Sequence, residues 1–298
     1  MAIVLLAVVA GGLAAWWVTR PALRIEPVTM VCNGWALRGD VYLPRRVTSD
    51  TAILLLHGST ARGRSLTLYK ELAARLCRHG FIVCNLDQRG YNESDGPKVV
   101  STLEDLDFVS DARDAARELV EKMGSRGVRK VALVGHSFGG GVAVAAGLSS
   151  DDVAAIVSIS PGRRIRERFS GNLSEKNGLR YVQKRRTADL GLEEPIPLEL
   201  VEPMLASYDV EQFRGARSSK PLLFVEGDRE PADDMAFMKD LAASMTGPVE
   251  HRIIPDAAHY FGTEIQRVNG EKRWVVVREP VLDELVAVVA GFVNSASK

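Results

Sequence analysis

The chain has 298 residues, of which 46% are hydrophobic, and its 38 basic residues are balanced by 38 acidic residues. This length and apolar content suffice for one large domain with a single core. The charge balance lacks the basic excess that is typical of nucleic-acid-binding proteins, so we expect no nucleic-acid partner. The 3 cysteines, an odd number, argue against a disulfide framework and favour buried free thiols.

The N-terminal segment differs from the rest of the chain. Residues 2–18 carry no charge, and Trp17 precedes Arg20, an arrangement that suits a membrane–water boundary. No Lys or Arg precedes the apolar run, as a signal peptide would require. We therefore predict a single-pass membrane anchor at residues 1–20, with the main domain, residues 25–298, on the cytoplasmic side. The alternative is a cleaved signal peptide and a secreted or periplasmic protein.

After this segment, short apolar runs alternate with amphipathic stretches, as buried strands and covering helices do. Strands are predicted at Val28–Cys32, Gly39–Leu43, Ile53–Leu56, Phe81–Leu86, Val131–Val134, Val153–Ile159, Pro221–Val225 and Val249–Ile254. Helices are predicted at Leu66–His79, Ser101–Met123, Gly139–Leu148, Asp234–Met245 and Pro280–Val293, the second of them opened by a capping box of Ser101 and Glu104. The alternation predicts an α/β fold, with a mostly parallel sheet of about eight strands and helices on both faces.

One long stretch has no strand pattern. It lies between the predicted strand that ends at Ile159 and the one that begins at Pro221. Insertions of this length in a compact domain are usually functional. We predict that residues 162–216 form a small helical lid.

A strand, a serine and a helix follow one another at Gly135-His136-Ser137-Phe138-Gly139. This context is the one that a nucleophile elbow requires, because the strained turn projects the serine hydroxyl out of the sheet. Glycines two residues before and two after the serine let the strand and the helix pass closely. Ser137 is therefore the candidate nucleophile.

His57-Gly58-Ser59-Thr60 follows the predicted strand Ile53–Leu56. Acyl transfer builds negative charge on the carbonyl oxygen, and fixed backbone N–H donors stabilise that charge. We expect one donor from Phe138, directly after the serine, and one from Ser59, with Thr60 in reserve. We interpret His57 as a structural loop residue.

A serine hydroxyl needs a base within hydrogen-bond distance, and the base needs a carboxylate that holds its tautomer. In chains with a nucleophile elbow, the order along the sequence is the serine, then the carboxylate, then the histidine. His259 lies in the loop after the last predicted strand and fits the base, whereas His251 lies inside that strand. The loop after Val225 offers two carboxylates, Asp228 and Glu230.

These motifs resemble the α/β-hydrolase superfamily, in its lid-bearing branch of esterases, lipases and serine aminopeptidases. The resemblance covers nearly everything after about residue 28. It includes Asp87–Ser94, which looks like the family's D-x-R-G-x-G-x-S segment with Asn92 at a position where glycine is common; we interpret this segment as structural. The family's acid loop often runs Gly-x-x-Asp-Pro, and that spacing places Glu230 at the acid position, with Asp228 as the alternative.

The resemblance implies an α/β-hydrolase fold and a mechanism without metal or cofactor. Ser137 would attack an acyl carbonyl, His259 would take its proton and Glu230 would orient His259. The N–H groups of Ser59 and Phe138 would hold the oxyanion. We expect a serine hydrolase that cleaves carboxylic esters, including lipid-derived esters or thioesters.

Three other functions remain open on the sequence. They are a peptidase or amidase of the serine aminopeptidase type, an acyltransferase, and a non-catalytic membrane-tethered binding protein. The expected partners are a small-molecule or lipid acyl substrate and, through the N-terminal segment, a membrane. The sequence defines neither the acyl chain nor the oligomeric state.

Overall fold

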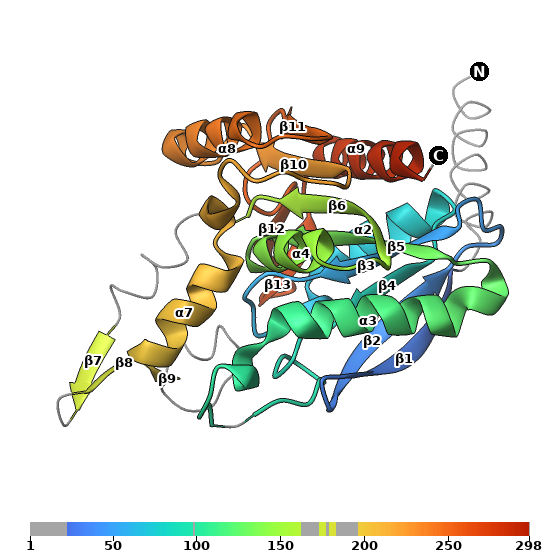
Figure 1. The fold of residues 1–298 in the computed structure, drawn as a ribbon. Helices are drawn as coiled ribbons and strands as arrows, with labels where there is room; N and C mark the ends of the chain where they lie inside the picture. Colours follow the sequence, from blue (N-terminus) through green and yellow to red (C-terminus); the bar gives the residue numbers. More distant parts are fainter. Residues whose placement is uncertain (1–22, 98, 162–172, 177–178, 183–195, 298) are drawn as a thin grey trace, which may run out of the picture.

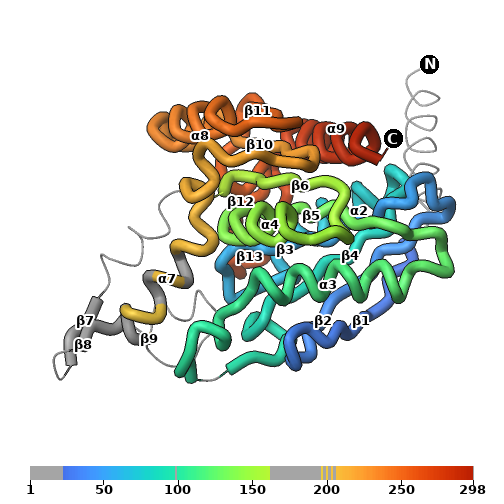
Figure 2. Tube along the Cα trace, viewed as in Figure 1, coloured from blue at the N-terminus to red at the C-terminus, as the bar shows by residue number. Residues whose placement is uncertain are grey.

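A computed structural model of the chain describes residues 23–97, 99–161, 173–176, 179–182 and 196–297. Its main sheet has eight strands in the order β1-β2-β4-β3-β5-β6-β10-β11 (Figure 1). These strands are β1 Arg24–Cys32, β2 Trp35–Leu43, β3 Thr51–Leu56, β4 Val83–Leu86, β5 Lys130–His136, β6 Val153–Ile159, β10 Leu222–Gly227 and β11 Val249–Ile254. β1 and β2 are antiparallel to each other, β2 and β4 likewise, and all other neighbours are parallel. The first strands form one edge of the sheet and the last strands the other (Figure 2).

Helices cover both faces of this sheet (Figure 1). They are α2 Thr67–Arg78, α3 Phe108–Met123, α4 Phe138–Leu148, α8 Ala232–Ser244 and α9 Glu279–Ala296. The buried side chains of α3, α4 and α8 share one core, and those of α2 and α9 share the other. β3 alternates between the two cores, with Leu54 in the first and Ile53 and Leu55 in the second. Successive side chains of a strand point to opposite faces, so a continuous apolar run is what a sheet covered on both sides requires. The predicted fold class is confirmed.

The start of α3 differs from the prediction. The capping box of Ser101 and Glu104 does not form, and α3 begins at Phe108. Asp107 caps it, because its Oδ1 accepts a hydrogen bond of 2.9 Å from the N–H of Ser110. The predicted capping residues belong to a preceding turn in which Asp105 accepts from the N–H of Ser101 at 2.8 Å.

A hairpin between His259 and α9 was not predicted. Its strands are β12 Thr263–Val268 and β13 Glu271–Val276, paired antiparallel. Asn269 and Gly270 make the turn with φ of 52° and 84°. An Asn-Gly pair is the residue choice that favours a two-residue hairpin turn, and it was the signal in the sequence.

The predicted helical lid contains strands as well as a helix. Within residues 162–216 the structure describes β7 Leu173–Lys176, β8 Leu179–Val182 and β9 Ile196–Pro197, which form a separate three-stranded sheet, and α7 Leu198–Tyr208. Residues 162–172, 177–178 and 183–195 lie outside the described part of the chain.

The prediction of a single-pass membrane anchor is contradicted, and so is the localisation that depended on it. Over residues 23–297 as the structure describes them, no helix combines the length and the apolar character that a membrane span needs. The longest described helix, α9, has 18 residues and carries charged Asp283 and Glu284. Residues 1–20, on which the prediction rested, lie outside the described residues.

Candidate active site

Ser137 lies in a strained turn between β5 and α4. Its φ of 54° and ψ of −120° lie in a region that costs a non-glycine residue about 1–3 kcal/mol. The turn is held by a hydrogen bond of 2.8 Å from the Ser137 N–H to the carbonyl of Ile159. A Cβ at Gly139 would lie 2.3 Å from the backbone oxygen of Leu56, and one at Gly135 would lie 1.9 Å from the oxygen of Gly139. Only glycine fits these two positions, as the motif predicted.

The loop after β3 lies directly beside this turn. A Cβ at Gly58 would come within 3.0 Å of the Ser137 Cβ. The N–H of Ser59 donates to no backbone carbonyl in the described part of the chain. Phe138 is the first residue of α4, where backbone N–H groups have no intrahelical acceptor. The two N–H groups that were predicted to bind an oxyanion therefore flank the serine without backbone acceptors of their own.

His57 fills a structural position in that loop. It is fully buried, with its Nδ1 2.7 Å from the carbonyl of Gly58 and its Nε2 accepting from the N–H of Gln88 at 3.0 Å. A carbonyl only accepts, so Nδ1 carries the proton. Burial lowers the pKa of His57. Both ring nitrogens are occupied, which leaves neither free to act as a base.

Glu230 and His259 come together from two loops. Glu230 follows β10 and His259 follows β11, and the Glu230 Oε1 lies 2.9 Å from the His259 Nδ1. The side chain of Glu230 is 11% exposed and that of His259 34%. Burial alone would raise the pKa of Glu230, but the hydrogen bond and the charge of His259 outweigh it and lower that pKa. Asp228, the alternative acid, is exposed to solvent.

The same contact fixes the tautomer of His259. An ionised carboxylate can only accept a hydrogen bond, so Nδ1 carries the proton and Nε2 keeps its lone pair. The His259 ring centroid lies 4.8 Å from that of His136, the residue before Ser137. The structure thus brings the His259 ring close to the elbow with Nδ1 bonded to Glu230, which leaves Nε2 as the nitrogen that can act as a base.

A chain of buried hydrogen bonds joins the three loops of the site. The Gly58 N–H donates to the hydroxyl of Tyr69 at 2.7 Å, and that hydroxyl lies 2.9 Å from the His136 Nδ1. The His136 Nε2 lies 2.7 Å from the carbonyl oxygen of His259. Because that carbonyl only accepts, the His136 Nε2 must donate, and its Nδ1 must accept from Tyr69. Each group in this chain therefore has one possible role.

Burial keeps this chain neutral. Burial, and secondarily the charge of His259, lower the pKa of His136 to about 3, although the hydrogen bond to the His259 carbonyl raises it. Burial likewise raises the pKa of Tyr69. His136 is therefore a neutral imidazole over the whole physiological range.

The Asp87–Ser94 segment holds the loop before α2. Asp87 is fully buried, accepts from the N–H of Arg64 at 2.6 Å and forms an ion pair with its guanidinium. Asn92 donates to Asp87 at 2.9 Å and has a φ of 49°, a left-handed conformation that asparagine tolerates in place of glycine. These contacts are structural, as expected.

Of the buried polar chain, neither Tyr69 nor His136 was predicted. Tyr69 lies in the predicted first helix, and its only distinguishing feature there is a hydroxyl on an otherwise apolar face. His136 stands inside the elbow motif itself at a position that the motif leaves open. A single sequence does not say which of these side chains face each other.

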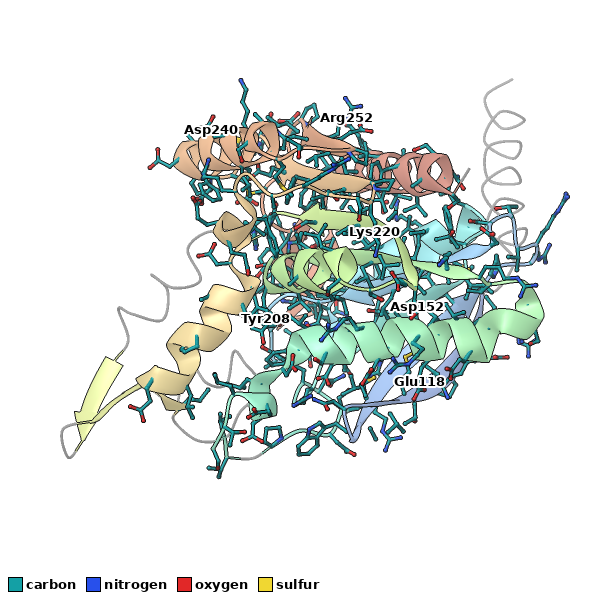
Figure 3. The ribbon with its side chains drawn as sticks, viewed as in Figure 1. Glu118, Asp152, Tyr208, Lys220, Asp240 and Arg252 are labelled. Atoms are coloured by element: carbon teal, nitrogen blue, oxygen red, sulfur yellow. The ribbon has the colours of Figure 1, made fainter. Side chains whose placement is uncertain are left out.

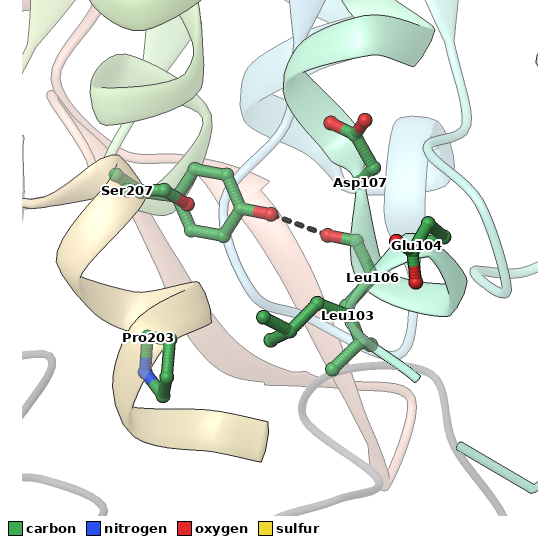
Figure 4. Close-up of a pocket in the computed structure, with 7 residues that line it drawn as sticks. Leu103, Glu104, Leu106, Asp107, Pro203 and Ser207 are labelled. Carbon is green, nitrogen blue, oxygen red and sulfur yellow. Dashed lines mark hydrogen bonds between the residues drawn. The ribbon is translucent and has the colours of Figure 1, made fainter. Parts of the chain in front are cut away.

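One cleft includes none of Ser137, Glu230 and His259. It has a volume of about 220 Å³ and is lined by Leu103, Pro203 and Tyr208 among others, between α7 and the turn before α3 (Figure 4). The Tyr208 hydroxyl donates to the carbonyl of Leu106, and its ring packs at 5.0 Å from that of Phe138. Tyr208 thereby ties α7 to the body of the molecule where α3 and α4 begin (Figure 3). None of the predicted catalytic residues lines this cleft.

Among the residues that the structure describes, no group of three or more His, Cys, Asp and Glu side chains is arranged to hold a metal ion. The cysteines are free and buried, as predicted, and burial raises the pKa of the Cys84 thiol to about 12.

Comparison with known proteins agrees with this architecture. Residues 48–187 match the family model described as "Serine aminopeptidase, S33". A search of curated proteins by sequence gives no match. Among solved structures, an esterase from Pyrococcus furiosus has a TM-score of 0.61 at 17% identity, covering 93% of this chain and 94% of that one. The ferulic-acid-bound Est1E from Butyrivibrio proteoclasticus has a TM-score of 0.63 at 15% identity, covering 90% and 98%. A dienelactone hydrolase from Anabaena variabilis has a TM-score of 0.57 at 16% identity, covering 93% and 99%.

Proposed function

We propose that the chain is a serine hydrolase of the α/β-hydrolase superfamily, which cleaves carboxylic esters through an acyl-enzyme on Ser137; the family model over residues 48–187 and the shared fold support this. The observation that carries the proposal is the 2.9 Å contact between Glu230 and His259. It is supported by the ring centroid of His259, which lies 4.8 Å from that of His136, the neighbour of the strained Ser137. A strained serine, an oriented imidazole and a buried carboxylate are the parts that nucleophilic acyl transfer needs.

The proposed reaction runs in two halves. The Ser137 Oγ attacks the carbonyl carbon while the Nε2 of His259 takes the hydroxyl proton, and Glu230 stabilises the cation that forms. The carbon–oxygen bond to the leaving alcohol then breaks, and His259 gives its proton to the departing oxygen. Water next attacks the acyl carbon, His259 accepts its proton, and the carboxylic acid leaves as Ser137 recovers its own.

The oxyanion of each tetrahedral intermediate lies, in this proposal, between the N–H groups of Ser59 and Phe138. Each such donor contributes about 3 kcal/mol to the transition state, because it is fixed before the charge develops. Two features support these donors: the close approach of Gly58 to Ser137 and the place of Phe138 in the first turn of α4.

Esters are the favoured substrates for two reasons. The structural neighbour from Pyrococcus furiosus is named as an esterase, and an alcohol is a better leaving group than an amine. The lipid-derived substrates expected from the sequence depended on a membrane tether and are not part of the proposal. Peptide or amide hydrolysis is the second candidate, favoured by the description of the family model that matches residues 48–187.

The proposal is tested by trapping the intermediate. The full chain and its Ser137→Ala variant are mixed with p-nitrophenyl acetate, quenched in acid and weighed by mass spectrometry. We expect one acetyl group on the wild type and none on the variant; an unmodified wild type that still releases p-nitrophenol contradicts the acyl-enzyme. Comparing kcat/KM for an aminoacyl ester and the matching anilide decides between esterase and peptidase, the latter being favoured if the anilide reacts faster.

A further inference from the structure

The hairpin β12–β13 (Figure 1) lines a cleft together with His259. The N–H of Val277 donates to the carbonyl of Gly262 at 2.8 Å and closes the base of the hairpin, and the hydroxyl of Thr67 in α2 donates to the carbonyl of Trp274 in β13 at 2.8 Å. The Trp274 ring also packs edge-on at 4.6 Å from that of Tyr260. These contacts hold the hairpin against the loop that carries His259.

A cleft of about 410 Å³ lies between that loop and the hairpin. His259 and Tyr260 line it from the loop side, and Ile265 and Trp274 line it from the hairpin side. Ile265 and Trp274 are direct cross-strand partners, so both side chains project from one face of the hairpin. This volume falls in the range of small-molecule sites, and Ile265 is 54% exposed although it is a large apolar side chain.

The position of His259 indicates which part of a substrate would bind in this cleft. In the proposed mechanism the imidazolium gives its proton to the leaving oxygen as the carbon–oxygen bond breaks, so the leaving group departs against His259. The cleft includes His259 and excludes Ser137. It therefore lies on the leaving-group side of the reacting carbonyl and away from the acyl chain.

The lining gives the chemistry of the leaving group. The lining is aromatic or aliphatic at Tyr260, Ile265 and Trp274, and it also includes the charged residues Asp256, Glu264 and Arg278. There Arg278 donates to the carbonyl of Asp256 at 2.9 Å and faces Glu264 at 4.0 Å, so its charge already has partners within the chain. An uncharged leaving group with an aromatic ring or a branched alkyl group matches such walls, and a carboxylate does not find a free cation there.

We propose that the cleft between His259 and the β12–β13 hairpin binds the leaving alcohol of the substrate and selects alcohols that carry an aromatic or branched apolar group. This inference rests on the proposed function and deepens it. The hairpin, on this view, is a specificity element added between the proposed catalytic histidine and the last helix.

The test compares two esters that share an acyl group, benzyl acetate and ethyl acetate, on the full chain. The variants are Ile265→Ser and, as a matched control, Gln266→Ser, since Gln266 is exposed on the opposite face of the same strand. We expect wild type to prefer the benzyl ester. Ile265→Ser should lower the benzyl-to-ethyl ratio of kcat/KM about fivefold to tenfold, because it removes apolar contact with the ring, and Gln266→Ser should leave that ratio within about twofold of wild type.

Two results overturn the inference while the proposed function stands: a wild type that prefers the ethyl ester, or an Ile265→Ser variant that keeps the wild-type ratio. Labelling of Ser137 with a fluorophosphonate is measured on every variant to show that the nucleophile and its base are intact. If the wild type neither takes the label nor hydrolyses either ester, the proposed function itself fails and the inference falls with it.

Discussion

Replacement of Tyr69 by phenylalanine tests the buried hydrogen-bond chain of the site. The substitution keeps the ring in its place in the core and removes only the hydroxyl. That hydroxyl accepts from the Gly58 N–H at 2.7 Å and donates to the His136 Nδ1 at 2.9 Å. Tyr69 and His136 are each only 2% exposed, so water does not replace the missing group.

The expected magnitude follows from the two groups left without partners. A buried polar group that loses its hydrogen bond costs about 1–3 kcal/mol, so the free energy of unfolding should fall by about 3 kcal/mol or more. Tyr208→Phe is the matched control, because Tyr208 is almost as buried as Tyr69 and its hydroxyl, which donates to the carbonyl of Leu106, lies outside this chain of hydrogen bonds. Its loss should cost about 1–2 kcal/mol.

Activity should respond to the same change. Tyr69 ties the loop with Gly58 to His136, and His136 in turn bonds the loop with His259, so removing the Tyr69 hydroxyl loosens the arrangement of the expected oxyanion donor and the base. Displacements of about 1 Å cost up to 100-fold in rate, and we expect fluorophosphonate labelling of Tyr69→Phe to be about 10- to 100-fold slower than wild type. Tyr208→Phe should label within about twofold of wild type, because its hydroxyl bonds outside these loops.

The assay pairs guanidinium unfolding with the time course of labelling for the two variants. The reasoning is refuted if Tyr69→Phe unfolds and labels like wild type. It is also refuted if the labelling rates of both variants fall by the same factor, since the effect would then come from general destabilisation and not from the chain of hydrogen bonds.

Three further predictions concern the acid, the buried histidine and the elbow. Glu230→Gln should lower kcat/KM for an ester about 1,000-fold or more, whereas Asp228→Asn should stay within about twofold in the same assay. The pKa of His136 is about 3 in the folded state and about 6.5 in the unfolded state. Between these values the unfolded state binds more protons, so the free energy of unfolding falls as the pH falls. His136→Gln should reduce the slope of the free energy of unfolding against pH by up to about 1.4 kcal/mol per pH unit, measured in unfolding curves from pH 6 to 4. Gly139→Ala should lower the free energy of unfolding by about 3 kcal/mol, because its Cβ meets the backbone 2.3 Å away; Gly291→Ala, with open space around it, should raise stability by up to about 1 kcal/mol.

Each of these predictions has an outcome against it. A larger loss in Asp228→Asn than in Glu230→Gln would exchange the roles of the two carboxylates. An unchanged pH slope in His136→Gln would mean that His136 titrates normally in the folded state. Equal stability of Gly139→Ala and Gly291→Ala would show that the elbow is less tightly packed than its geometry indicates.

The fold was predictable because its signals are local. The apolar side chains of β3 contribute to both cores, and a continuous apolar run of this length is typical of a strand in a sheet that is covered on both faces. The elbow at Ser137 was predictable for the same reason: the glycine at position 139 and the strand before it report a close backbone approach that a short motif encodes. In the acid loop, the spacing of the family motif favoured Glu230 over Asp228, and the structure has Glu230 in contact with His259.

What was missed depends on side chains that are distant in sequence. Tyr69 and His136 meet across 67 residues, and the partner of the His136 Nε2 lies 123 residues further along the chain. No periodicity reports such pairings. The start of α3 was misplaced because Asp107 competed with Ser101 as a cap, and both residue types are favoured at that position. The Asn-Gly pair in residues 263–276 indicates a hairpin turn, but the hairpin was not predicted.

The most direct test of the account is fluorophosphonate labelling of the full chain, followed by identification of the modified peptide. The account predicts a single adduct on Ser137, lost in Ser137→Ala and formed far more slowly in His259→Ala. A folded wild type that takes no label, or a label that persists in Ser137→Ala, would contradict the claim that this elbow carries an activated nucleophile.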